Sequence, residues 1–506
     1  MLARANQLVL PMRLVVLVGL FVAAFGIRLY QVQDPPLNFQ ATRQYRSLLL
    51  AREYYFEAVG SIPIWQREVA AISAERQGLL EPPILEHVAA LGYRLMGGET
   101  LWLPKVVSSL FWLLGGVFLY RIATRLADTY AATLSTTFYL FLPFGVLASR
   151  SFQPDPLMVM LLLGSVLAML RWRERPTLAR FGLLTCLSAM ALLTKPIVLF
   201  PVLSVFVALS VAQSGVRATA WSRATVAFVL ATILPTLAVY SYGILSGTFL
   251  VKEAEKTLLP QLVLSSFFWE HWLGYVGAVV SFPVVVAALI GTALIKQRTP
   301  RALMLGFWVG YALFCLVVNY NLATHDYYQL QLIPIVALGM APLAELVLKW
   351  IYQARPQRVV RMAVWGVLGL AIALAIVRAE MRLAQADLTR EVAIAEEIGA
   401  QVNHSTHTLY LAADYGVPLE YHGQLSGAAW PIASDLEWEG LAGAHHLSAE
   451  ERFQSWFAKD APEFFIILDL SELDDQPDLK QFLTHNFSLI AQRPEYWLFD
   501  LRHPAR

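Results

Sequence analysis

Cysteine is almost absent from this chain: its 506 residues include only Cys186 and Cys315, and both lie inside apolar runs. Two cysteines in such settings predict neither a disulfide framework nor a cysteine-rich metal site. Charge is also scarce, because 15% of the residues are charged whereas 57% are hydrophobic. The mean hydropathy of +0.54 excludes an ordinary soluble protein. The composition therefore predicts a polytopic α-helical membrane protein.

Several motifs of soluble proteins are missing as well. The sequence contains no Gly-rich phosphate-binding loop, no Cys/His zinc spacing and no recognisable Ser/His/Asp triad. Its basic residues are scattered among short loops, so nucleic acid is not an expected partner. No cofactor is predicted, although the sequence leaves room for a divalent cation.

Eleven apolar runs are long enough, or nearly so, to cross about 30 Å of hydrocarbon. They cover residues 10–30, 102–120, 130–149, 156–170, 178–194, 196–214, 224–247, 272–295, 303–319, 329–348 and 360–379. With the N-terminus inside, the inner loops hold fifteen Lys and Arg, and the short outer loops after the first hold four. The loop 31–101 and the C-terminal part of the chain are therefore predicted on the outer side.

A shift in charge near residue 380 divides the chain. Residues 380–506 contain 21 Asp and Glu against 8 Lys and Arg, whereas residues 1–379 contain 16 against 30. Strand-like runs at 407–412, 464–468, 489–491 and 496–500 alternate with helical stretches in the acidic part. We predict a transmembrane domain over 1–379 and a small soluble α/β domain over 380–506, which is an ordinary domain size.

The loop 31–101 carries many charges and two amphipathic segments. The first segment runs from about 43 to 59, and the second runs from 82 to 96 and is ended by Gly97 and Gly98. Both are too short and too polar to span a bilayer, and helices of this kind lie in the membrane interface. We expect this loop to cover an active site at the outer surface.

Ionisable residues that interrupt or edge the apolar runs fall on the same outer face. A charge at the centre of a span costs about 2.5–3.5 kcal/mol, so such residues tend to mark a functional site. They are Arg150, Asp155, Lys195, Lys252, Glu253, Lys256, His325 and Asp326. A transporter would instead place polar residues near the midplane and show internal symmetry, and neither feature is evident.

Each of these residues also has a purely structural interpretation. Asp155 can cap the helix that follows it, and Lys195 can be a snorkelling lysine. His325 and Tyr328 can belong to an interfacial aromatic belt. In the functional interpretation, Lys195 holds a phosphate as a point charge, and Arg150, His325 and Tyr328 supply further hydrogen bonds.

The order of the motifs resembles the GT-C glycosyltransferases, in particular glycosyltransferase family 39, which includes protein O-mannosyltransferases and the aminoarabinose transferase of lipid A. The stretches that carry the resemblance are TRQYRSLLLAREYY, EPPILE, SRSFQPDPLM, LLTKP, HDYYQLQLIP and, in the tail, ADYGVPLEYHGQLSGAAWP. The resemblance implies sugar transfer from a polyprenyl-phosphate donor to a lipid, glycan or protein acceptor. It places this reaction at the outer face of the inner membrane, with a periplasmic tail. It further implies Arg150, Lys195 and His325 as phosphate ligands, and Asp155 as a structural or metal-contacting acid.

The resemblance also implies an essential acidic residue early in the first outer loop, and here the sequence departs from the pattern. Asn38 occupies that position, and an amide cannot accept a proton at neutral pH. Glu81, Glu86 or Asp34 is then the candidate general base, which needs hydrogen-bond reach to the acceptor hydroxyl. The remaining alternatives are a catalytically silent relative that binds a lipid-linked sugar, and a lipid-linked glycan transporter.

Overall fold

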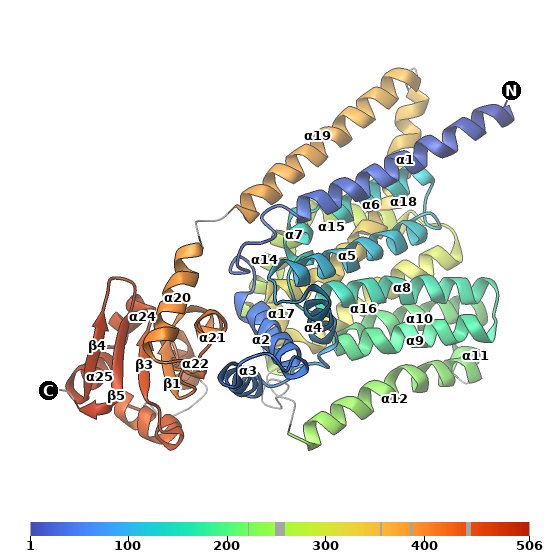
Figure 1. Ribbon diagram of the computed structural model, residues 1–506. Helices are drawn as coiled ribbons and strands as arrows, with labels where there is room; N and C mark the ends of the chain where they lie inside the picture. The colour runs from blue at the N-terminus through green and yellow to red at the C-terminus, as the bar shows by residue number, and fades with distance from the viewer. Residues whose placement is uncertain are drawn as a thin grey trace. The chain divides into compact units, whose positions relative to one another are not determined.

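The computed structural model describes residues 2–220, 222–247, 259–354, 357–384, 388–441 and 447–504. These residues form two compact units (Figure 1). The first unit comprises Met1–Val32, Leu79–Ile84 and Trp102–Ala384. The second comprises Gln33–Gly78, Leu85–Leu101 and Gln385–Arg506, so it combines most of the loop 31–101 with the C-terminal part of the chain.

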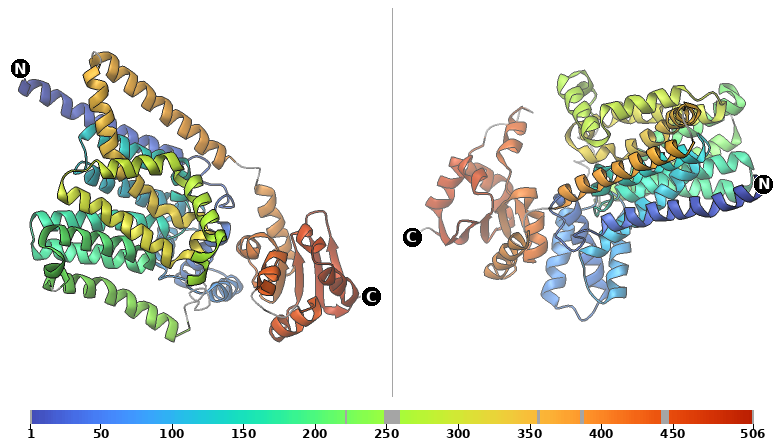
Figure 2. Two further views of the ribbon diagram at one scale, coloured as in Figure 1. Left: turned by 180° about the vertical axis from the view of Figure 1, so that it is seen from behind. Right: turned by 90° about the horizontal axis from the view of Figure 1, so that it is seen from above.

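The described residues of the first unit form helices joined by turns, and its long helices run side by side (Figure 2). Its first six helices are α1 (Leu2–Arg28), α5 (Trp102–Ala123), α6 (Thr129–Phe141), α7 (Pro143–Ser149), α8 (Asp155–Glu174) and α9 (Leu178–Thr194). The middle of the unit consists of η1 (Pro196–Val198), α10 (Leu199–Ser214), α11 (Val216–Ala220), α12 (Arg223–Leu245) and η2 (Pro260–Leu264). The remaining elements are α14 (Ser266–Val280), α15 (Phe282–Ala293), α16 (Arg298–Val317), α17 (Asn319–Thr324), η3 (Asp326–Gln331), α18 (Leu332–Ala354) and α19 (Gln357–Leu383).

Six helical segments of the described chain are long and apolar enough to cross a membrane, and two bent pairs raise the number to eight. The pairs α6–α7 and α14–α15 bend by 58° and 83°. Pro143 at the first bend lacks the backbone N–H that would continue the helix, and Ser281 at the second has a φ of 66°. The helical membrane architecture is confirmed, whereas the predicted count of eleven spans is not.

Glycine allows two of these helices to pack closely. Gly306 and Gly310 lie one turn apart on α16, facing α10. A Cβ atom at Gly310 would lie 2.5 Å from the Cα of Pro201, and one at Gly306 would lie 2.7 Å from the Cα of Val205. Small residues at this spacing bring helix backbones together in membranes, where dispersion rather than the hydrophobic effect drives association.

The second unit contains a five-stranded sheet with the order β2-β1-β3-β5-β4. Its strands are β1 (Thr408–Leu411), β2 (Gly427–Ala429), β3 (Phe464–Ile467), β4 (Phe487–Gln492) and β5 (Trp497–Pro504). β1 pairs in parallel with β2 and β3, while β5 is antiparallel to both β3 and β4. The four strand-like runs of the sequence are thus β1, β3, β4 and β5.

Both faces of this sheet are covered by helices (Figure 1). Phe465 and Ile467 point to one face and Phe464 and Ile466 to the other, and all four are buried. Continuous apolar strands of this type are expected where a sheet is buried on both sides. The covering elements are α20 (Thr389–Gln401), η4 (Ala413–Gly416), α21 (Val417–Gly423), α22 (Ala433–Leu441), α23 (Ala449–Arg452), η5 (Phe453–Phe457), η6 (Ala458–Asp460), α24 (Leu470–Asp474) and α25 (Pro477–Asn486).

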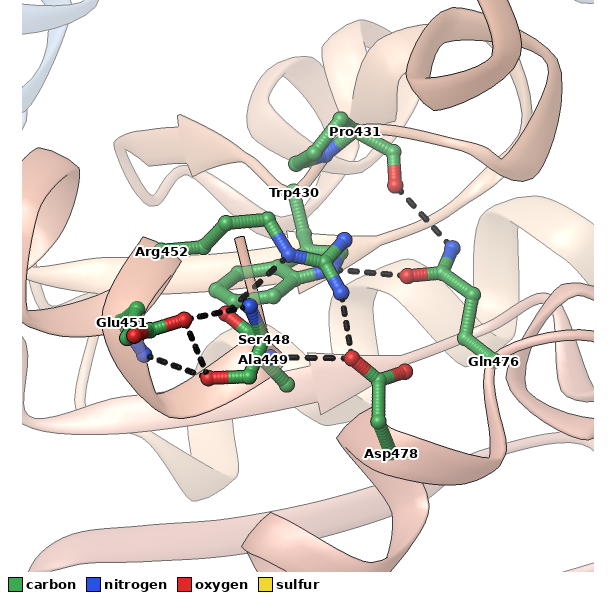
Figure 3. Close-up of polar contacts among 8 residues, drawn as sticks. All are labelled: Trp430, Pro431, Ser448, Ala449, Glu451, Arg452, Gln476 and Asp478. Atoms are coloured by element: carbon green, nitrogen blue, oxygen red, sulfur yellow. Dashed lines mark hydrogen bonds and ion pairs between the residues drawn. The ribbon is translucent and has the colours of Figure 1, made fainter. Parts of the chain in front are cut away.

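A buried polar network fixes α23 against the sheet (Figure 3). Arg452, which is 4% exposed, donates a 2.6 Å hydrogen bond to Asp478 and lies 5.3 Å from the ring centre of Trp430. The indole of Trp430 donates to Gln476, which itself donates to the carbonyl of Pro431. A buried cation needs a partner, and Asp478 is the partner of Arg452. The two charges are therefore accounted for by this ion pair and do not indicate a ligand-binding site.

The loop 31–101 contributes α2 (Ala41–Ala58), α3 (Ile64–Gln77) and α4 (Ile84–Met96). The helices α2 and α4 correspond to the two predicted segments, whereas α3 was not predicted. Within the second unit, Arg52 on α2 forms an ion pair with Glu99 at 3.0 Å and donates to the carbonyl of Tyr421 at 2.6 Å. Tyr45 and His422 share a hydrogen bond of 2.8 Å. These buried contacts attach the loop helices to α21.

Candidate active site

The centre of the candidate site is a buried ion pair between Asp155 and Lys195. The Nζ atom of Lys195 lies 2.9 Å from Oδ1 and 3.0 Å from Oδ2 of Asp155. The side chains of Lys195 and Asp155 are 4% and 0% exposed. Asp155 is the first residue of α8, and Lys195 directly follows α9. The structure thus joins two residues that the sequence analysis had placed in separate motifs.

Two tyrosines of η3 flank the lysine. The Nζ atom of Lys195 is 4.9 Å from the ring centre of Tyr327 and 4.4 Å from that of Tyr328, within the range of cation–π attraction. Asn321 donates a 2.7 Å hydrogen bond to the hydroxyl of Tyr328 and so fixes its position. The His325 ring lies 6.0 Å from that of Tyr328. Of the predicted site residues, Asp155 and Tyr328 therefore lie against Lys195, and His325 lies beside Tyr328.

Arg150 has a different environment from the one expected of a phosphate ligand. Its guanidinium donates to the backbone carbonyls of Tyr30 at 2.6 Å and Gln31 at 2.9 Å. Nearby in sequence, Ser149 accepts a 2.8 Å hydrogen bond from Arg28, which is completely buried on α1. Both arginines therefore tie the end of α1 to the turn that precedes Asp155.

Two buried glutamines lie in the segments that carry Asp155 and Tyr328, and neither was among the predicted site residues. Gln153 lies in the turn before Asp155, and Gln331 ends η3. Both are 0% exposed, and among the described residues neither amide has a hydrogen-bond partner at its oxygen or its nitrogen. In a 3-10 helix, residues three apart are eclipsed, so Gln331 shares a face with Tyr328. The sequence indicated these two residues only through their positions in the motifs SRSFQPDPLM and HDYYQLQLIP.

The carboxylates proposed as a base are distributed over both units. Glu81 is partly exposed and belongs to the first unit with Asp155, whereas Asp34 and Asn38 belong to the second and are partly exposed. Glu86, also in the second unit, is 8% exposed and accepts a 2.7 Å hydrogen bond from Ser47.

Glu53 on α2 was not among the predicted site residues, but its pKa is perturbed. Burial and the neighbouring charge of Glu57 raise the pKa of Glu53 to about 7. The predicted outer-face residues Lys252, Glu253 and Lys256 lie outside the described part of the chain.

The described residues contain no group of three or more His, Cys, Asp or Glu arranged to hold a metal ion. Asp155, the predicted metal-contacting acid, has a lysine ammonium against both of its oxygens. With the Lys195 ammonium in that position, the Asp155 carboxylate is a poor ligand for a metal ion, because the ammonium and the metal ion would repel each other. The residues present therefore do not fit a divalent ion at Asp155.

Known proteins resemble this chain in a segment of sequence and over its whole fold. Residues 80–239 match the family model described as dolichyl-phosphate-mannose-protein mannosyltransferase. ArnT from Cupriavidus metallidurans, bound to undecaprenyl phosphate, has a TM-score of 0.59 and 15% identity, covering 95% of this chain and 97% of ArnT. The fold is that of the GT-C glycosyltransferases.

A second GT-C structure agrees with this assignment. The Archaeoglobus fulgidus oligosaccharyltransferase AglB, in complex with an inhibitory peptide and a dolichol-phosphate, has a TM-score of 0.51 and 13% identity. The match covers 93% of this chain and 72% of AglB. No curated protein matches the chain. The resemblance to GT-C glycosyltransferases is confirmed, and the chain is a multi-pass membrane protein with the GT-C fold.

Proposed function

We propose that this GT-C chain transfers a sugar from a polyprenyl-phosphate donor to a lipid, glycan or protein acceptor at the outer face of the inner membrane. The observation that carries the proposal is the buried Asp155–Lys195 pair, flanked by Tyr327 and Tyr328, within a GT-C fold. The solved relatives ArnT and AglB support the donor class, because they were captured with undecaprenyl phosphate and dolichol-phosphate.

Lys195 is the group best suited to bind the lipid phosphate. An ammonium has three N–H donors, and two suffice for the two oxygens of Asp155. The third is left for a phosphate oxygen, while Asp155 holds the charge in place and Tyr327 and Tyr328 exclude water. A preorganised cation stabilises the negative charge that develops on a departing phosphate.

The reaction is a displacement at the anomeric carbon. The acceptor hydroxyl attacks this carbon, the bond between the carbon and the phosphate oxygen breaks, and the polyprenyl phosphate leaves. A general base takes the proton of the acceptor hydroxyl. Glu81 is the best candidate, because it belongs to the same compact unit as Asp155, whereas Glu86 belongs to the other unit and the amide of Asn38 cannot accept a proton.

The test uses the purified chain in detergent, a labelled polyprenyl-phosphate monosaccharide and a membrane extract that supplies acceptors. We expect transfer by the parent, at least a hundredfold loss in Glu81→Gln and Lys195→Met, and little change in Glu86→Gln. Absence of transfer to every acceptor would refute the proposal. Activity that arises only in Asn38→Asp would identify the native chain as catalytically silent.

The same proposal puts the C-terminal domain in the periplasm. Glu396 is an exposed residue of α20, so a cysteine introduced there is accessible to a membrane-impermeant maleimide from the periplasmic side. Labelling that requires permeabilised cells would contradict this orientation.

A further inference from the structure

A polar groove lies between α3 and the loop that leads into β1, entirely within the second unit. Its volume is about 800 Å³, which is within the usual range for a ligand pocket. Its walls come from α3, residues 401–407, the start of β3 and the end of β5. No step proposed for the transfer reaction uses any of these residues.

One wall of the groove is an aromatic plate. Trp65 on α3 is 40% exposed, and its ring stacks on that of His404 with centroids 4.4 Å apart and planes 23° apart. His404 donates from Nδ1 to the carbonyl of Gly423 at 2.9 Å, so the ring beneath the indole is fixed. A large aromatic side chain that is already held in one orientation loses little conformational entropy when a ligand packs against it.

The other walls offer hydrogen-bond donors and acceptors together. Glu68 and Glu463 supply carboxylates, Gln401 and Asn403 supply amides, and Arg502 supplies a guanidinium. Ser405 donates to Glu463 at 2.8 Å. The described lining therefore has neither the excess of cations that an anionic ligand requires nor the apolar character that a peptide side chain prefers.

The charge of Arg502 is already balanced. Its Nε and Nη2 atoms donate to the two oxygens of Asp500, both at 2.9 Å, and its guanidinium lies 4.5 Å from the ring centre of Phe464. A ligand group that meets such mixed partners must both donate and accept, as a hydroxyl does. A sugar ring combines hydroxyls on its edge with C–H bonds on its face, and those bonds pack against aromatic rings.

We propose that this groove binds a neutral oligosaccharide, with one sugar ring on the indole of Trp65 and its hydroxyls on the polar walls. The inference rests on the proposed glycosyltransferase function in one respect: the bound glycan is the acceptor. Sugar binding itself is measured without any transfer reaction.

The experiment is saturation-transfer difference NMR on the full chain in a detergent without a sugar headgroup, because a maltoside would compete for the groove. The probes are maltotetraose, chitotetraose and mannotetraose, with a tetra-alanine peptide as the comparison. We expect transfer to the ring protons of at least one tetrasaccharide, and at least a tenfold weaker Kd in Trp65→Ala. Trp65→Phe retains an aromatic face and should keep most of the binding.

Two matched controls separate the groove from general effects. Trp456 is 41% exposed in the same unit but does not line the groove, so Trp456→Ala should bind as the parent does. Glu75 is exposed on α3, also outside the groove, so Glu75→Gln should have no effect, whereas Glu68→Gln should weaken binding several-fold. The inference is wrong if no tetrasaccharide binds, if only the peptide binds, or if Trp65→Ala and Trp456→Ala behave alike.

The outcome also separates this inference from the proposed function. A parent chain that transfers sugar but binds none of the tetrasaccharides would overturn the groove alone. A parent that binds them but transfers no sugar would overturn the transferase proposal and the acceptor role, and would leave the groove as a glycan-binding site.

Discussion

The burial of the Asp155–Lys195 ion pair predicts how much stability the protein loses when either residue is replaced. Removal of either partner leaves an uncompensated charge in a site that is almost fully enclosed, and this typically costs about 3–5 kcal/mol. Asp155→Asn and Lys195→Met should each lower the free energy of unfolding by about this amount. The double variant should lose much less, because no unpaired charge remains, so the coupling energy of the cycle should exceed about 2 kcal/mol.

The assay is unfolding of the purified protein by SDS in mixed micelles, with each variant compared in a double-mutant cycle. A matched control is the exposed pair of Glu345 and Lys349 on α18, whose side chains are 22% and 60% exposed. Its coupling energy should be about 0.5 kcal/mol or less. A coupling for Asp155 and Lys195 as small as the control would show that solvent reaches the pair.

Transfer activity then separates stability from function. If Lys195 binds the donor phosphate, the double variant should recover stability but remain inactive, because its methionine cannot attract an anion. A double variant that transfers sugar at the parental rate would refute the phosphate role of Lys195, and the ion pair would be structural only.

Three further predictions concern other parts of the chain. Gln153→Leu and Gln331→Leu should keep or raise stability in SDS titrations, because a buried unpaired amide costs about 1–3 kcal/mol, while sugar transfer should fall if those amides hold donor hydroxyls. Burial raises the pKa of Glu420 to about 7, from an ordinary value of 4.5. The folded state therefore binds more protons between these values, and its stability should fall by about 3 kcal/mol from pH 4.5 to 7 and stay level above. Melting curves of Glu420→Gln should lack this change. Gly310→Ala should lower the melting temperature by several degrees, whereas Gly274→Ala, whose Cβ meets nothing within 4 Å, should not.

The sequence predicted the elements that have a strong periodic pattern. The helices α2 and α4 and the strands β1, β3, β4 and β5 each have an apolar stripe or a continuous apolar run. By contrast, β2 consists of Gly427, Ala428 and Ala429, which have little β propensity. It exists because Gly427 lies against Thr408, where a Cβ would meet the carbonyl oxygen at 2.1 Å. Pairing that depends on such a distant partner cannot be predicted from local pattern.

The candidate residues could be grouped from the sequence by their positions at the ends of apolar runs, but their contacts could not be predicted. The sequence indicated that Arg150, Asp155, Lys195 and His325 lie near one membrane face. It could not indicate that Arg150 donates to backbone carbonyls, because both a phosphate and a carbonyl offer an oxygen acceptor to a guanidinium. The unpaired amide of Gln153 was equally invisible, since a partner is revealed only by the packing around it.

The helical hairpin explains why Asp155 and Lys195 meet although they are 40 residues apart. Helices α8 and α9 pack together and are joined by a short turn, so the first residue of one lies beside the last residue of the other. A carboxylate at a helix N-terminus and an ammonium at a helix C-terminus are each favoured by the helix dipole, typically by 0.3–1 kcal/mol. The hairpin thus holds both charges before any donor arrives. If Lys195 binds a phosphate, the phosphate must still lose its own water, but the ammonium is already desolvated and held in place by folding. A cation preorganised in this way stabilises a charged leaving group without reorganisation of the site.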